Sequence, residues 1–223
     1  MSNRWLIFDF DGVIADSEVL ANRVLAEIVT ALGVATTLED SYRLFMGKRF
    51  PDVIAAIQTA VGRELPETFP ADYQSRTLAR FRKELRPVQG ARAYIDAFAH
   101  LQRCIASSSS ADRLALCLDV LGLEHVFAGN VFSGSQVARG KPHPDIFLHA
   151  ARAMNEAPAR AIVLEDSVAG VQAGVAAGMT VIGILAGSHI QEGYHEELRA
   201  AGAHHVAATF AEAETITRAL SMS

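Results

Sequence analysis

Short apolar runs alternate with longer amphipathic or alanine-rich stretches along most of this chain, and this alternation constrains its fold more than any other feature. The apolar runs, rich in Val, Ile and Phe, predict strands over residues 5–10, 103–107, 130–133, 161–165 and 180–185, with a weaker strand near 204–207. The stretches between the later runs predict helices over residues 113–121, 145–154, 168–177, 195–201 and 211–220. Such a pattern is typical of an α/β domain whose mostly parallel sheet is covered by helices on both faces.

One region, from about residue 17 to residue 86, breaks this alternation. It shows no strand pattern, only helical patterns over residues 18–32, 38–46, 51–61 and 70–84. Connections within α/β units usually have about 2–6 residues outside the helix, so a helical stretch of this size is an insertion. We therefore predict an α/β core formed by residues 1–15 and 87–223, and an all-helical second domain formed by residues 16–86.

Composition places the chain among ordinary globular proteins. Half of its residues are apolar (50%) and its mean hydropathy is +0.19, enough for a sizeable buried core. No window approaches the roughly 18 consecutive apolar residues of a membrane span, and Asp9 and Asp11 interrupt the N-terminal apolar run, unlike a signal peptide. Cys104 and Cys117 are too few for a disulfide framework, so we expect reduced cysteines and a cytoplasmic protein.

The charge balance bears on the binding partners. The formal net charge is −5 with a pI near 5.9, and the scattered basic residues argue against a nucleic-acid surface. An acidic chain that binds an anion must build a local positive site from a cation, a lysine or backbone amides. The eight histidines show no paired metal-ligand spacing, and we assign none of them a catalytic role. We expect a monomer that binds a small molecule, with neither nucleic acid nor membrane as a partner.

The first polar cluster, Asp9-Phe10-Asp11-Gly12, comes at the end of the first predicted strand. Residues two apart in a strand point to the same side, so both carboxylates can face one site at the carboxyl end of the strand, where ligands bind in open α/β sheets. Gly12 lets the backbone turn sharply and approach a ligand. A charged turn after a strand would look the same, so this motif alone leaves both interpretations open.

The second cluster is "CIASSSS", in which a predicted strand ends in four serines and a helix starts near Ala111. A serine at the tip of a strand suits an anion, because a hydroxyl donor, free N–H groups and the helix dipole converge there. Capping of the helix by Ser109 or Ser110 is the alternative, and we expect that as well.

The third cluster is "GKPHPDIF". Gly140 frees the backbone, whereas Pro142 and Pro144 stiffen it, and Pro144 opens the next helix. Lys141 is thereby held on a rigid loop, as a cation that serves one geometry would be. An exposed surface lysine is the common alternative.

The fourth cluster is "IVLEDSVAGVQAGVAAGM", in which a further strand ends in Glu165 and Asp166 and a helix follows. The acidic pair suits either a ligand site or the start of a helix. Gly170, Gly174 and Gly178 are four residues apart, so we expect them to lie on one helical face and to allow close packing on the sheet.

All four clusters lie at predicted strand ends on the same edge of one sheet. They contribute two carboxylates, a hydroxyl, a lysine and two more carboxylates. A hard divalent cation such as Mg²⁺ takes oxygen ligands from a few carboxylates and shares substrate phosphate, and it would cancel the repulsion between Asp9 and Asp11. The sequence therefore predicts a magnesium site at this edge.

In this order, the clusters resemble the four motifs of the haloacid dehalogenase superfamily, and more narrowly those of its capped sugar-phosphate phosphatase and β-phosphoglucomutase branch. The residues that carry the resemblance are "DFDGVIADSE", "ASSSS", "GKPHPDIF" and "EDSVAGVQAG". The resemblance covers nearly the whole chain, because the helical insertion falls where that branch carries its cap. It implies a Rossmann-like core with an inserted all-helical cap domain, and a Mg²⁺-dependent phosphatase.

The resemblance also implies roles for the acidic residues. Asp9 would be the nucleophile that forms an aspartyl-phosphate, and Asp11 would protonate the leaving alcohol and then activate water. Asp9, Asp166 and the backbone carbonyl of Asp11 would bind Mg²⁺, with Glu165 binding directly or through water.

The phosphoryl group would be held by the remaining motif residues. Ser107 and Lys141 would bind its oxygens and neutralise the charge that develops on them. Gly12 and Ser108 would add backbone N–H donors.

Selection of the leaving group would reside in the cap. The candidates are Glu18 and Asn22, one helical turn apart, and the adjacent Lys48 and Arg49. Two cations suit a polyol or a second anionic group, so we expect a phosphorylated sugar or sugar acid. The alternative, to which we give equal weight, is that these residues are surface charges on a solvated face of the cap.

Other functions stay open at this point. Asp11 argues against a dehalogenase, because a halide needs no protonation. β-Phosphoglucomutase carries a cap histidine near the position of Ala21 and a cap arginine near that of Phe50, and neither residue matches here. The adjacent Lys48 and Arg49 could substitute for the arginine, so it is the missing histidine that favours hydrolysis over mutase chemistry. A phosphonoacetaldehyde hydrolase needs a Schiff-base lysine, and the spacing of Lys48 does not fit. A phospho-receiver switch is the non-enzyme alternative, although such modules are shorter and lack a helical insertion.

Overall fold

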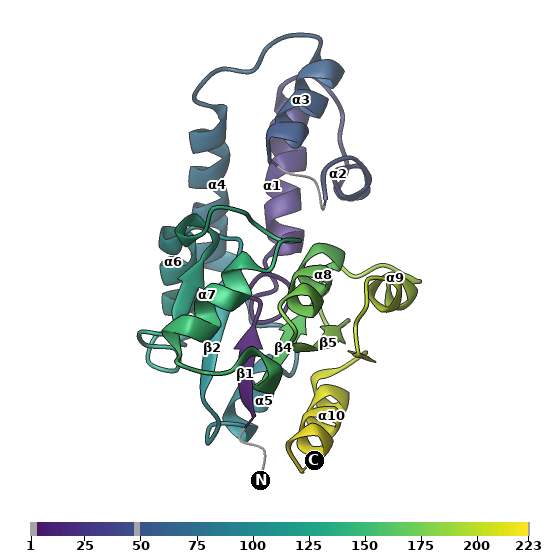
Figure 1. Cartoon of the computed structure of the whole chain (residues 1–223). Helices are drawn as coiled ribbons and strands as arrows, with labels where there is room; N and C mark the ends of the chain where they lie inside the picture. Colours follow the sequence, from purple (N-terminus) through teal and green to yellow (C-terminus); the bar gives the residue numbers. More distant parts are fainter. Residues whose placement is uncertain (1–3, 47–49, 223) are drawn as a thin grey trace. The chain divides into compact units, whose positions relative to one another are not determined.

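The computed structural model describes residues 4–46 and 50–222. The chain forms two compact units: Met1–Asp16 together with Arg86–Ser223 make one, and Ser17–Leu85 make the other. The first unit contains the sheet, whereas the described part of the second is helical (Figure 1). The larger unit is therefore discontinuous in sequence, with one strand before the helical unit and the remaining strands after it.

A six-stranded parallel sheet forms the centre of the larger unit, in the order β3-β2-β1-β4-β5-β6. The predicted α/β fold is confirmed, and each predicted strand is present with ends that differ by at most two residues. The strands are β1 (Trp5–Phe8), β2 (Arg103–Ser107), β3 (Val131–Ser133), β4 (Ala161–Glu165), β5 (Thr180–Ile184) and β6 (His205–Ala207).

Strand β1 lies inside the sheet, and both of its neighbours come later in the chain. Strands β2 and β3 lie on one side of it and β4, β5 and β6 on the other, so the strand order reverses at β1. Its four residues, WLIF, are all apolar and buried, as expected for a strand covered on both faces. In open parallel sheets, ligands bind outside the carboxyl ends of the strands at such a reversal.

The first strand ends two residues earlier than predicted. Asp9 still donates its backbone N–H to the carbonyl of Leu164 at 2.9 Å, but the chain then turns, and the Gly12 N–H donates to Ala15 O at 2.7 Å. Asp11 and Ala15 form an isolated bridge. Gly12 has a φ of +79°, which is accessible to glycine at little cost. The acidic motif is therefore a tight loop that follows the strand.

Helices cover both faces of this sheet. Ile7 packs with residues of α7 and α8, whereas the ring of the next residue, Phe8, lies 5.9 Å from that of Tyr94 in α5, so the two side chains face opposite ways. The predicted helices are present with ends shifted by one or two residues. The helices of this unit are α5 (Ala91–Ala97), α6 (Ala111–Leu121), α7 (Asp145–Ala153), α8 (Val168–Ala176), α9 (Tyr194–Ala200) and α10 (Phe210–Met222).

Helix α5 is absent from the sequence prediction. Its buried residues Ala91, Tyr94 and Ile95 lie at helical spacing, so the apolar signal was present in this seven-residue segment although no helix was predicted there. Tertiary contacts also hold it: the buried Tyr94 hydroxyl hydrogen-bonds with Thr217 Oγ1 of α10 at 2.6 Å. Its start follows Gly90, whose φ is +86°.

The smaller unit is an all-helical cluster with its own core. Helix α2 begins at a capping box, in which the Thr37 hydroxyl accepts from the Asp40 N–H and the Asp40 carboxylate accepts from the Thr37 N–H. The rings of Phe50 and Tyr73 stack at 5.4 Å. Its described helices are α1 (Glu18–Ala31), α2 (Leu38–Phe45), α3 (Phe50–Val61) and α4 (Phe69–Glu84), and its buried core comprises Val24, Leu25, Ile28, Val29, Phe45, Val53, Ile57 and Phe69.

Within residues 4–46 and 50–222, none of the helices combines the length and the apolar character that crossing a bilayer requires.

The glycine face predicted for the helix after β4 is only partly correct. A Cβ at Gly174 would lie 2.7 Å from Val181 Cγ2 of β5, so this glycine does allow α8 to pack closely on the sheet. A Cβ at Gly170 would lie 1.9 Å from the Glu165 carboxyl carbon, so the lack of a side chain at Gly170 leaves room for the Glu165 carboxylate. Gly178 lies beyond the end of α8 with a φ of +72° and terminates the helix.

This packing predicts that Gly174→Val lowers the free energy of unfolding by about 1–3 kcal/mol, because the added atoms overfill the space between α8 and β5. Gln172→Val is the matched control at an exposed position of the same helix, with an expected change within about 0.5 kcal/mol. Chemical denaturation of both variants measures the difference, and equal midpoints would contradict the close packing.

Candidate active site

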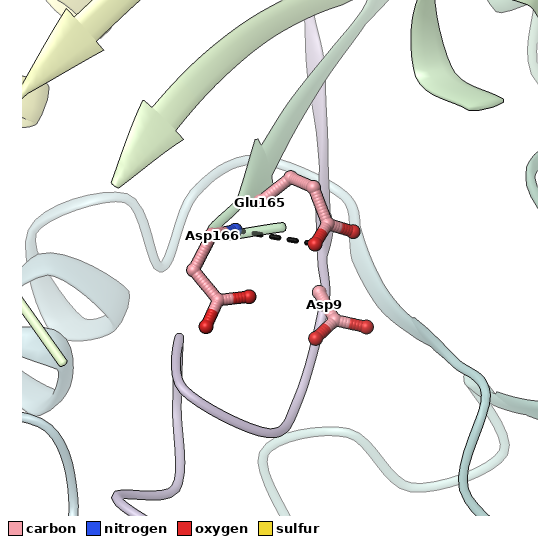
Figure 2. A group of neighbouring side chains, drawn as sticks. All are labelled: Asp9, Glu165 and Asp166. Carbon is pink, nitrogen blue, oxygen red and sulfur yellow. Dashed lines mark hydrogen bonds between the residues drawn. The ribbon is translucent and has the colours of Figure 1, made fainter. Parts of the chain in front are cut away.

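Three carboxylates meet where strands β1 and β4 end (Figure 2). Asp9 follows β1, Glu165 is the last residue of β4, and Asp166 comes next. The paired register of Phe8 and Leu164 brings the two strand ends side by side. One oxygen of each carboxylate lies within 4.8 Å of the others, and the exposed fractions of the three residues are 7%, 0% and 4%. The clustering predicted from strand ends is therefore present for these acids.

Lys141 supplies a positive charge to this cluster. Its Nζ donates to Asp9 Oδ1 at 2.6 Å and to Glu165 Oε2 at 2.7 Å. The ammonium group also lies 4.9 Å from the centre of the Phe147 ring. Burial opposes the charge on Lys141, but the Asp9 and Glu165 carboxylates outweigh burial and raise the pKa of the amine. The lysine on the Gly-Lys-Pro loop is thus a buried cation of the site.

The cluster carries more negative charge than Lys141 balances. Burial, followed by the charge of Glu165, raises the pKa of Asp9 well above its usual range, and Asp166 adds to this effect, whereas Lys141 opposes it. Three buried carboxylates and one ammonium leave an uncompensated negative charge, which is costly in a site of low dielectric. A hard divalent cation with oxygen ligands would remove that excess. The donor set therefore fits Mg²⁺.

The Glu165 carboxylate is fixed by a second set of donors. Its Oε1 accepts from the Asp166 N–H at 3.2 Å, from the Ser167 N–H at 3.1 Å and from the Ser167 hydroxyl at 2.8 Å. The Ser167 hydroxyl in turn accepts from the Gly170 N–H at 3.1 Å and caps helix α8. Glu165 is therefore oriented by the start of α8 as well as by Lys141.

His189 contacts the cluster from the loop after β5. Its Nε2 lies 3.1 Å from Asp166 Oδ2, and the residue is 7% exposed. A Cβ at Gly12 would lie 2.8 Å from the His189 ring, and one at Gly187 would lie 2.7 Å from it, so the ring occupies a slot between two glycines. No site role was predicted for this histidine from the sequence. Its position in the loop after β5, at the edge of the sheet where the other clusters lie, was the available signal.

The Asp11 carboxylate is held by residues that do not belong to the cluster of three carboxylates. Its Oδ2 accepts from the Ser109 hydroxyl at 2.6 Å, and its Oδ1 accepts from Arg113 Nη2 at 2.5 Å. Ser109 and Arg113 come from the segment after β2, so the serine-rich cluster does meet the acidic motif. Arg113 is a second residue of this region that was not selected from the sequence.

The hydroxyl-rich turn after β2 is internally hydrogen-bonded. The Ser107 hydroxyl accepts from the Ser109 N–H at 3.1 Å, and Ser107 is buried, whereas Ser108 is exposed. Ser110 caps helix α6 by accepting from the Arg113 N–H, as expected for this turn. The N–H of Gly12, which the resemblance assigns to a phosphate, donates to Ala15 O in this structure.

The residues predicted to select the leaving group belong to the helical unit. Asn22 is buried there: its Nδ2 donates to Glu18 O at 2.9 Å, and its Oδ1 accepts from the Ser41 hydroxyl at 2.9 Å, which ties α1 to α2. These bonds give Asn22 a structural role within the unit. Glu18 is the first residue of α1 and is partly exposed. Lys48 and Arg49 lie outside the described residues.

The sequence and the fold both match known proteins. The family model of the haloacid dehalogenase-like hydrolases matches residues 6–184. A 6-phosphogluconate phosphatase of Escherichia coli is 31% identical over 185 residues, which is 82% of this chain and 83% of the relative. A phosphorylated carbohydrates phosphatase of Thermotoga maritima is 30% identical, over 78% of this chain and 81% of the relative. A hydrolase of Deinococcus radiodurans, solved with bound phosphate and sodium, superposes with a TM-score of 0.84 at 30% identity, covering 99% and 97% of the two chains.

The excess negative charge leads to a prediction about the metal-free protein. A carboxyl group whose folded pKa is raised favours the folded state below its unfolded pKa of about 3.9 and loses that contribution as pH rises through the folded value. In EDTA at pH 8, Asp9→Asn should therefore unfold at a higher temperature than wild type, and the difference should shrink as the pH falls. Mg²⁺ should then raise the midpoint of wild type more than that of the variant.

Asp119→Asn is the control for this comparison, because Asp119 is an exposed carboxylate on α6. Its midpoint should follow wild type in both EDTA and Mg²⁺. An Asp9→Asn protein that is less stable than wild type at pH 8 without metal, or equal gains with Mg²⁺ in both proteins, would contradict the charge argument.

Proposed function

The chain belongs to the haloacid dehalogenase-like hydrolase family, and from that premise we propose that it is a Mg²⁺-dependent phosphatase acting on a small phosphorylated metabolite. The observation that carries this proposal is the buried Asp9 carboxylate, held by Lys141 and surrounded by Glu165 and Asp166. A buried carboxylate beside a cation and an acidic metal-type cluster suits nucleophilic attack on an electron-poor phosphorus atom. Asp9 would form an aspartyl-phosphate.

Two half-reactions follow from the two carboxylates. In the first, an Asp9 oxygen attacks phosphorus, the bond from phosphorus to the leaving oxygen breaks, and the protonated Asp11 gives its proton to that oxygen. In the second, the Asp11 carboxylate takes a proton from a water molecule that attacks the same phosphorus atom, and the bond to Asp9 breaks. Inorganic phosphate and an alcohol are released, and both residues return to their starting states.

The phosphoryl group is held by residues at three strand ends in this proposal. The Ser107 hydroxyl at the end of β2 and the Lys141 ammonium group bind its oxygens, and the backbone N–H groups of Ser108 and Gly12 add donors. Gly12 would have to exchange its bond to Ala15 O for one to phosphate.

Mg²⁺ would be held by the side chains of Asp9 and Asp166 and the backbone carbonyl of Asp11, with Glu165 binding directly or through water. The bound ion supplies charge neutralisation for the phosphoryl oxygens and for the carboxylates. Glu165 is also tied to Lys141, so it keeps the lysine beside Asp9.

We further propose that the substrate is a phosphorylated sugar or sugar acid. Two of the similar proteins are named as phosphatases of 6-phosphogluconate and of phosphorylated carbohydrates.

The helical unit would act as the cap that selects the leaving group, through Glu18 and, outside the described residues, Lys48 and Arg49. The proposal includes a cytoplasmic monomer, in keeping with the free thiols of the buried Cys104 and Cys117.

A catalytic assay tests this function directly. Phosphate should be released from 6-phosphogluconate, or from other sugar phosphates in a panel, with Mg²⁺ present and not with EDTA. Asp9→Asn should lower the rate by a factor on the order of 10³ or more while remaining folded. Asp119→Asn should keep wild-type activity, because its carboxylate is exposed on α6.

The products separate the remaining alternatives. A mutase would convert one sugar phosphate into its isomer without net release of phosphate, and a receiver switch would retain one equivalent of phosphate on the protein. Either outcome, or full turnover by Asp9→Asn, would contradict the phosphatase proposal.

A further inference from the structure

The second acid of the motif, Asp11, is held by a charged residue whose position calls for an explanation. Arg113 Nη2 donates to Asp11 Oδ1 at 2.5 Å, while the Ser109 hydroxyl donates to Asp11 Oδ2 at 2.6 Å. The side chains of Arg113 and Asp11 are only 20% and 14% exposed. An ion pair shielded from water to this degree holds its geometry better than a surface pair does.

Helix stability does not account for the position of Arg113. The residue is the third of helix α6, which begins after the N-cap Ser110. A cation in the first turn of a helix is unfavourable, because the macrodipole places partial positive charge there. Asp112, the preceding residue, has the favourable charge for this position. The contact with Asp11, rather than the stability of the helix, therefore explains why an arginine occupies this position.

The surroundings of the pair strengthen its electrostatic effect. Cys117, one helical turn after Arg113, is completely buried. Burial raises the pKa of its thiol to about 12, and the charge of Asp11 adds to the effect while Arg113 opposes it. The Asp11–Arg113 pair thus borders an apolar region, in which charges interact over a longer range than they do in water.

The two acids of the motif therefore have separate cations. Asp9 is paired with Lys141 at the ends of β1 and β4, and Asp11 is paired with Arg113 from the segment after β2. We propose that Arg113 is a positioning residue for Asp11, which fixes the carboxylate through Oδ1 and leaves Oδ2 to carry the proton exchanged with the leaving alcohol and with water. This inference rests on the proposed phosphatase function.

The proton transfers of the proposed reaction are compatible with this geometry. When Oδ2 carries the proton, the Ser109 hydroxyl can rotate and become the acceptor, because a hydroxyl is both a donor and an acceptor. The proton passes from Oδ2 to the leaving oxygen as the bond from phosphorus to that oxygen breaks. Oδ2 then receives a proton from water when the aspartyl-phosphate is hydrolysed. Arg113 keeps its own protons throughout, since guanidinium does not titrate in proteins.

The test compares two esters that differ in their need for an acid. An alkoxide leaves slowly unless it is protonated, whereas p-nitrophenolate is a stable anion and leaves without a proton. The ratio kcat/KM reports the steps up to transfer of the phosphoryl group to Asp9. It is measured with Mg²⁺ for p-nitrophenyl phosphate and for the faster of 6-phosphogluconate and glucose 6-phosphate. The proteins are wild type, Arg113→Met, Arg113→Lys, Asp11→Asn and the double variant Asp11→Asn/Arg113→Met.

Arg113→Met should lower kcat/KM for the sugar phosphate by about 10- to 100-fold, part of the roughly 10²–10⁴-fold that general acid–base catalysis supplies. The value for p-nitrophenyl phosphate should fall by less than about 3-fold. In the Asp11→Asn background the same substitution should cost less than about 2-fold for either ester, because a residue that acts through Asp11 has nothing left to position. Arg113→Lys should recover part of the loss.

The matched control is Arg92→Met, which removes another arginine–aspartate pair from the larger unit, one that is exposed and joined to Asp96 at 3.2 Å. Its two kcat/KM values should equal those of wild type.

Equal losses for both esters in Arg113→Met, or a full additional loss in the Asp11→Asn background, would overturn the inference and make Arg113 a phosphate ligand or a merely structural residue. If Arg113→Met does not fold, the test rests on Arg113→Lys, whose loss of kcat/KM for the sugar phosphate is compared with its loss for p-nitrophenyl phosphate. A wild type that hydrolyses neither ester would remove the proposed function, and this inference with it.

Discussion

The concentration of carboxylates around Asp9 is the constraint on which the rest of the site depends. Asp9, Glu165 and Asp166 are buried within a few ångströms of one another, and the ammonium group of Lys141 lies among them. Buried carboxylates repel each other and lose hydration, so the arrangement persists only if cations and N–H donors compensate it. Lys141 and the first turn of α8 supply part of that compensation. A divalent metal accounts for the remainder in the function proposed above.

The topology of the sheet brings these charges together. Strand β1 lies at the point where the strand order reverses, so the segments after β1, β2, β4 and β5 all reach the same edge. The helical unit is inserted into the segment that follows β1, and this leaves the register between β1 and β4 intact. The two acids of the first motif then diverge in their contacts: Asp9 faces the metal-type cluster and Lys141, whereas Asp11 faces Ser109 and Arg113. Two chemically identical side chains thereby acquire different surroundings.

Much of this arrangement could be predicted from the sequence, for a definite physical reason. Buried parallel strands are apolar runs, and polar residues at the ends of such runs must share one sheet edge, which identified Asp9, Glu165 and Asp166. Lys141 was identified by its rigid loop between Gly140 and Pro142. Other features were missed. Helix α5 was not predicted although its buried Ala91, Tyr94 and Ile95 lie at helical spacing, and the buried Tyr94 also ties it to α10.

Arg113 and His189 were missed because neither of them stands directly at a strand end. Arg113 is inside a helix, where an exposed arginine is the ordinary expectation, and His189 lies several residues beyond its strand. Acid-quenched mass spectrometry of the protein during turnover of a sugar phosphate with Mg²⁺ tests the role of Asp9 as nucleophile most directly. We expect one phosphoryl group on the peptide that contains Asp9, at the Asp9 carboxylate. A phosphoryl group on another residue, or turnover with no covalent phosphoprotein at any quench time, would contradict it.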